Sequence, residues 1–91
     1  MTRQEILNIL HEKEKRCSAA RATYNSAKQA WEEAQQSGES AVSIQHLGAL
    51  KDTAYAMWQS TEKEIEEFII IEAHNTLLDV INAIDDFVKE S

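Results

Sequence analysis

Three histidines and one cysteine are the side chains of this sequence that most readily bind metals or attack a substrate. His11, His46 and His74 are separated by 35 and 28 residues, and none has an Asp, Glu or Cys four residues away. Only His11 has a carboxylate three residues away, that of Glu14. Zinc and di-iron sites on helices need such ligands in pairs, at spacings of three or four residues. We therefore expect no metal site and no cofactor.

Covalent and acid–base catalysis are also poorly supported by the sequence. Cys17 occupies a position of an apolar heptad pattern, where a small buried hydrophobic residue is expected, and no histidine is predicted close enough to activate its thiol. Neighbouring carboxylates point to different sides of a helix and cannot act on one substrate together. These pairs are Glu32-Glu33, Glu66-Glu67 and Asp85-Asp86. We expect a protein that is not an enzyme.

The composition restricts the class of protein further. The chain has 91 residues, and 9 Lys and Arg against 16 Asp and Glu give a formal net charge of −7. A chain of this length forms one small domain, and a single cysteine cannot form an internal disulfide. The first residues lack the apolar segment of a secretory signal, and no run approaches the ~20 apolar residues of a membrane span. We expect a cytoplasmic protein whose main partner is neither a membrane nor nucleic acid.

The first part of the chain carries the heptad pattern of a coiled coil. Steps of three and four residues connect positions that are apolar except for Lys13. These positions are Ile6, Leu10, Lys13, Cys17, Ala20, Tyr24, Ala27, Trp31 and Ala34. Thr2 and Glu5 form a capping pattern at the start, and Gly38 can take the left-handed conformation that ends a helix. The pattern predicts a helix over about 2–37.

A second helix is predicted over about 40–74, beginning at Ser40 or Ser43, with a turn at 38–39. Such a short connection makes the two helices antiparallel neighbours, and facing residues then have numbers that sum to about 77. In this register Lys13 lies beside Glu64, where its stem covers apolar surface and its ammonium reaches the carboxylate. Gly48 either permits close approach of Trp31 or marks a late helix start.

The last residues need a cover that the first helix is too short to provide. An apolar stripe follows Thr76 and Asp79, which repeat the capping pattern, so the chain either bends into a third helix at about 76–89 or continues as an arm. An exposed arm requires a partner, most simply a second copy. The expected interface residues are Ile65, Phe68, Ile69, Leu77, Val80, Ile81, Ile84, Phe87 and Val88. The predicted fold is all-α: an antiparallel two-helix coiled-coil hairpin with a C-terminal helical extension that dimerises into a helical bundle.

Charge is divided unevenly along the chain, since residues 1–37 carry +1 and residues 38–91 carry −8. An acidic face is expected on the second half, formed by Glu62, Glu66, Asp79, Asp85 and Asp86. The expected function is that of a small interaction factor that binds itself and another protein as an adaptor, co-chaperone or inhibitor. This appearance is typical of bacterial and phage accessory proteins. The alternatives are an acidic decoy that competes with nucleic acid for a basic protein, or a dimeric DNA-binding regulator.

Overall fold

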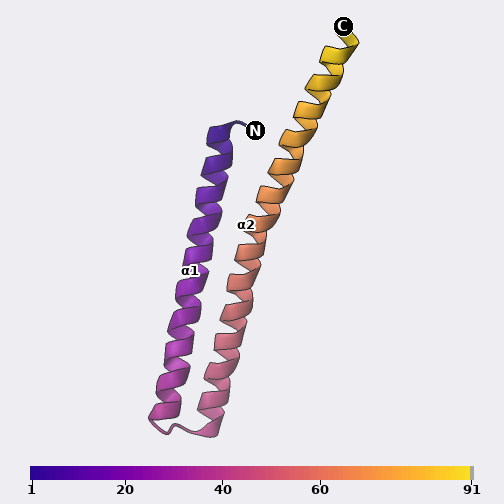
Figure 1. The fold of residues 1–91 in the computed structure, drawn as a ribbon. Helices are drawn as coiled ribbons and strands as arrows, with labels where there is room; N and C mark the ends of the chain where they lie inside the picture. Colours follow the sequence, from indigo (N-terminus) through magenta and orange to yellow (C-terminus); the bar gives the residue numbers. More distant parts are fainter. Residues whose placement is uncertain (91) are drawn as a thin grey trace.

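Two long antiparallel helices make up the fold (Figure 1). The computed structural model describes residues 1–90, in which α1 runs from Arg3 to Gln36 and α2 from Ala41 to Glu90. The described residues contain no strand. The molecule is a narrow rod of 78 × 20 × 13 Å, because α2 has 50 residues and α1 has 34. The predicted all-α hairpin with a C-terminal helical extension is confirmed.

Local hydrogen bonds explain where the helices begin and end. The Thr2 hydroxyl oxygen accepts a bond from the Glu5 N–H at 3.1 Å, as expected of an N-cap, and the Thr2 hydroxyl donates to the Glu5 carboxylate at 3.1 Å. Gly38 has a φ of +70°, and the Glu39 N–H donates to the Ala34 carbonyl at 3.1 Å. This bond is the long one of a Schellman motif, which needs a left-handed residue at Gly38. Ser40 caps α2 by accepting from the Ser43 N–H at 3.2 Å.

Side chains of unequal size fill the space between the helices near the turn. Ala34 is buried and Gly48 lies against Trp31, while Ala54 is buried further along α2. A Cβ atom at Gly48 would be 3.2 Å from Trp31 Nε1, which confirms that the glycine permits close approach of the tryptophan. The Lys51 ammonium lies 4.1 Å from the centre of the Trp31 ring, a cation–π contact that covers the outer side of the indole.

Three aromatic rings occupy the middle of the hairpin. The Tyr24 ring on α1 lies 5.3 Å from the Tyr55 ring and 5.6 Å from the Trp58 ring on α2, measured between ring centres. Tyr55 and Trp58 meet edge to face at 6.0 Å. The Trp58 Nε1–H is buried and has no hydrogen-bond partner, so the indole contributes by packing rather than by its polar atom.

Lys13 on α1 contacts α2 between the aromatic rings and the open end of the hairpin. Its ammonium lies 4.0 Å from a Glu64 carboxylate oxygen and 5.7 Å from the centre of the Phe68 ring. The Lys13 side chain is only 20% exposed, so its methylene stem fills an otherwise apolar position of the heptad line. Both expectations for this lysine are confirmed. One heptad position further along α1, Cys17 is buried as predicted.

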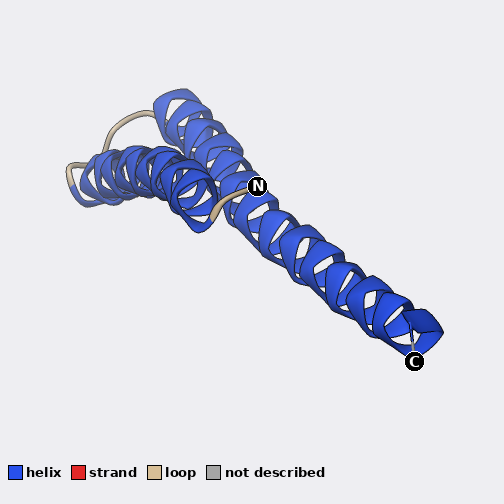
Figure 2. Cartoon of the chain, turned by 90° about the horizontal axis from the view of Figure 1, so that it is seen from above, coloured by secondary structure: helices blue, strands red, loops and turns tan. Residues whose placement is uncertain are grey.

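α2 continues through the junction where a bend was one of two expected outcomes. The capping pattern of Thr76 and Asp79 starts no new helix, because both residues lie within a continuous α-helix. No Gly or Pro follows Gly48, so nothing in the covalent structure interrupts the backbone hydrogen bonds. The chain therefore forms an arm that projects beyond the first turn of α1 (Figures 1 and 2).

Candidate interaction surface

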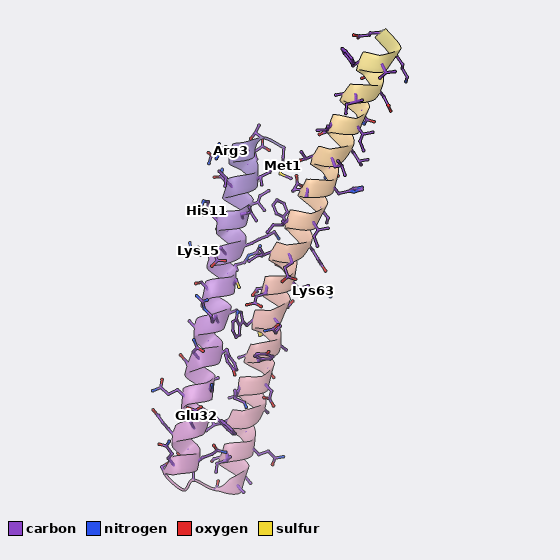
Figure 3. The ribbon with its side chains drawn as sticks, viewed as in Figure 1. Met1, Arg3, His11, Lys15, Glu32 and Lys63 are labelled. Carbon is purple, nitrogen blue, oxygen red and sulfur yellow. The ribbon has the colours of Figure 1, made fainter. Side chains whose placement is uncertain are left out.

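The arm is the part of α2 that α1 leaves uncovered. Glu72 is the last half-buried residue of α2, and every residue from Ala73 to Glu90 is exposed. Figure 3 shows the contrast: side chains fill the gap between the helices in the hairpin, whereas those of the arm have no facing helix. Apolar side chains on the arm are therefore available to another molecule.

The apolar side of the arm does not continue the side of α2 that packs on α1. Thr61, Ile65, Phe68 and Glu72 are half-buried and form the α1-facing line at steps of four, three and four. Continued along the helix, this line passes only through polar side chains. They are Asn75, Asp79, Asn82, Asp86 and Lys89. The surface that faces α1 thus becomes hydrophilic where α1 ends.

A second line of apolar residues begins where the apolar part of the α1-facing line ends. Each of its members comes one or two residues after a position of the α1-facing line or of its continuation. It consists of Ile70, Ala73, Leu77, Val80, Ile84 and Phe87, and we call it the arm stripe. At 3.6 residues per turn, this displacement turns the stripe by roughly a third of a turn from the α1-facing line. The apolar run 68–71 is where the two lines overlap: Phe68 belongs to the first and Ile70 to the second.

The arm stripe is exposed along its whole length. Ile70 is 68% exposed, Leu77 57% and Ile84 56%, and Val80 and Phe87 are exposed as well. Ile81 and Val88 widen the stripe on one side and are also exposed. From residue 70 to residue 87 the stripe is about 26 Å long at 1.5 Å per residue. A continuous apolar surface of this size is typical of an interaction site rather than of a helix face that stays exposed to solvent.

The structure divides the expected interface residues between two surfaces. Ile65 and Phe68 are half-buried on the α1-facing line, and Phe68 already contacts Lys13. Ile69 is exposed and lies beside the stripe. Leu77, Val80, Ile81, Ile84, Phe87 and Val88 are exposed together on the arm. Ile70 was absent from the expected set, although the polar continuation of the first line is a sequence signal that could have identified it.

The expected acidic residues do not share one face. On a straight helix, Glu62 and Glu66 lie in line with the arm stripe but before it begins, whereas Asp79 and Asp86 continue the α1-facing line. Asp85 points to a third side. Glu62 is half-buried and the other four are exposed. The arrangement spreads negative charge around α2 and forms no single acidic track.

The residues with catalytic potential lie apart from one another. His11, His46 and His74 are exposed, and His11 points away from α2 (Figure 3). Within residues 1–90 no group of three His, Cys, Asp or Glu side chains is placed to hold a metal ion, and no pocket is formed. In the same part of the chain, neither helix is apolar over a long enough stretch to cross a membrane.

Comparison with known protein families, with curated proteins and with solved structures finds no match to this chain.

Proposed function

We propose that this chain is a small non-catalytic interaction protein, an adaptor, co-chaperone or inhibitor, that binds a partner helix on its arm stripe. The observation that carries the proposal is the exposed apolar line of Ile70, Leu77, Val80 and Ile84 on a helix that α1 no longer covers. Covering one such side chain completely contributes about 1.5–3 kcal/mol, so a bare stripe is costly in water.

The shape of the stripe favours a helical partner. Apolar residues spaced three and four apart on a straight helix fit the grooves of a second helix, or of a helical bundle, at a separation of about 8–10 Å. The hairpin supports this role by holding the first part of α2 in a fixed direction. The side chains between the two helices of the hairpin already have contacts within the chain, such as those of Lys13 with Glu64 and Phe68.

The apolar stripe supports this function better than it supports an acidic decoy. A decoy needs its negative charges on one side, where they can replace a phosphate backbone, and here Glu66, Asp79 and Asp85 point to three different sides. The salt dependence of binding separates the two mechanisms. Binding through the stripe persists as ionic strength rises, whereas binding through the acidic side chains weakens steeply.

A matched pair of variants tests the proposal. Leu77→Glu places a charge on the stripe, and Leu78→Glu places the same charge on the adjacent residue, which lies off the stripe and is also exposed. The two variants and the unmodified chain are used in separate experiments to capture proteins from the native host. We expect captured proteins, this chain included, to be retained by Leu78→Glu and lost with Leu77→Glu. Equal retention by both variants would contradict the proposal.

A further inference from the structure

We infer that the arm stripe binds the arm stripe of a second copy of this chain, with the two arms running in opposite directions. This inference rests on the proposed function and names the partner of that surface. The twofold axis crosses the arm between residues 78 and 79, so that Leu77 of one copy faces Val80 of the other. In the same register Ala73 faces Ile84 and Ile70 faces Phe87.

Side-chain size favours this direction. In an antiparallel pair of helices, the a positions of one helix lie opposite the d positions of the other, and large residues pack best against small ones. Ala73 then meets the larger Ile84 at both ends of the symmetric interface. A parallel pair would place Ala73 against its own copy, which leaves a gap, and Ile84 against its own copy, which adds bulk elsewhere.

Residues that precede the stripe also oppose a parallel pair. The same heptad line continues backward from Ile70 through Glu66 and Lys63. Parallel helices would bring each of these charges beside its own counterpart, which is unfavourable. In the antiparallel arrangement the two copies of Glu66 lie at opposite ends of the paired arms, as do the two copies of Lys63, so neither charge faces its own counterpart.

All the acidic side chains of the arm except Glu90 lie where a second arm does not reach. The positions that flank the stripe are occupied by uncharged side chains except for Glu90. These flanking residues are Ile69, His74, Thr76, Ile81, Ala83, Val88 and Glu90. Glu72, Asp79, Asp85 and Asp86 are on the outer sides of the arm, where a pair of arms leaves them in water. Two copies can therefore meet despite the net charge of −7 on each chain.

The surface available is large enough for a stable pair. The large apolar residues of the stripe and its flank are 44–71% exposed. Each of these eight side chains exposes roughly 100 Å², so complete cover of both arms would bury at most about 1,600 Å². Specific interfaces bury about 1,200–2,000 Å² in total.

Sedimentation equilibrium of the full chain tests whether the pair forms. Concentrations up to about 100 µM cover the micromolar affinities that interfaces of this size reach. We expect a mass of twice 10.3 kDa for the unmodified chain and for Leu78→Glu. Leu77→Glu alters both copies and raises the dissociation constant by at least about 100-fold. Circular dichroism of each variant checks that the hairpin is still helical.

Cross-linking tests the direction of the arms. In a Cys17→Ala background, Ala73→Cys and Ile84→Cys are introduced separately and together, and a thiol–thiol linker shorter than about 10 Å is added. Residues 73 and 84 lie about 16 Å apart along the helix, so the linker cannot join them within one chain. Antiparallel arms link only in the double variant. Parallel arms link in each single variant, a result that overturns the inference.

The outcomes separate this inference from the proposed function. A chain that stays at 10.3 kDa but captures another protein through Leu77 overturns the self-pairing and leaves the proposed function in place. A monomeric chain for which Leu77→Glu and Leu78→Glu capture the same proteins overturns both. A mass above twice 10.3 kDa overturns the two-chain arrangement.

Discussion

Replacement of Lys13 by methionine is expected to stabilise the hairpin. Lys13 is the polar exception in the heptad line of α1, yet its side chain is only 20% exposed. Its ammonium makes a 4.0 Å ion pair with Glu64, which is 48% exposed, and a cation–π contact with the Phe68 ring at 5.7 Å. Methionine keeps the length of the side chain, removes the charge and leaves an apolar residue at the same position.

The magnitude follows from opposing contributions. An ion pair with a half-exposed carboxylate contributes about 0.5 kcal/mol, and a cation–π contact at this distance contributes about the same. Loss of both costs about 1 kcal/mol, whereas an apolar side chain that is mostly buried gains about 1.5–2 kcal/mol over one that carries a charge. Lys13→Met should therefore raise the free energy of unfolding by about 0.5–1 kcal/mol. Lys13→Ala, which also removes the packed stem, should lower it by about 1–2 kcal/mol.

The assay is urea unfolding followed by circular dichroism, with every variant at one chain concentration so that any self-association is held constant. Lys15→Met is the control, because Lys15 is exposed and points away from α2 (Figure 3). It should change the free energy of unfolding by less than about 0.5 kcal/mol. A loss of more than about 1 kcal/mol in Lys13→Met would refute the reasoning, since the electrostatic contacts would then outweigh the packing.

Further predictions concern the interior of the hairpin and use the same unfolding assay. Gly48→Leu should lower the free energy of unfolding by about 1–3 kcal/mol because its side chain collides with Trp31, and a combined Trp31→Ala change should relieve part of this loss, so additive losses would contradict the contact. Trp58→Phe should cost about 1–2 kcal/mol, because the smaller ring leaves space between the helices unfilled while the buried Nε1–H has no partner to lose, and a cost above about 3 kcal/mol would contradict this account. Cys17→Ser should cost about 1–2 kcal/mol more than Cys17→Ala, because the hydroxyl is buried, and alkylation of native Cys17 should be much slower than in urea.

The sequence was sufficient to predict the hairpin and several of its contacts. The heptad line of α1, the cap at Thr2 and the glycine at position 38 are local signals, and they place the helix ends within a residue or two. The antiparallel register followed from the short turn and predicted the pairing of Lys13 with Glu64. The contact between Gly48 and Trp31 followed from the size of the two residues.

Other features depend on geometry that spacing alone does not determine. Tyr24 contacts both Tyr55 and Trp58 because long side chains reach a full turn away from their own position, in a direction set by their rotamers. Lys51 covers Trp31 for the same reason. The change of apolar face between Phe68 and Ile70 was readable in principle. It was missed because Ile65 and Phe68 were assigned to the same stripe as Leu77, as steps of three and four can connect residues that drift around a helix.

The change of face at residues 68–70 means that the direction in which the arm stripe points depends on the number of residues that separate it from the α1-facing line. Every residue of an α-helix adds about 100° of rotation and 1.5 Å of length. Deletion of Ile69 would turn the stripe back almost into line with α1, and insertion of one residue would turn it to the opposite flank of the rod. Insertion of about four residues, which is close to one helical turn, would return the stripe nearly to its original direction. Small changes of chain length at this point could therefore redirect an entire assembly while leaving each apolar side chain unchanged.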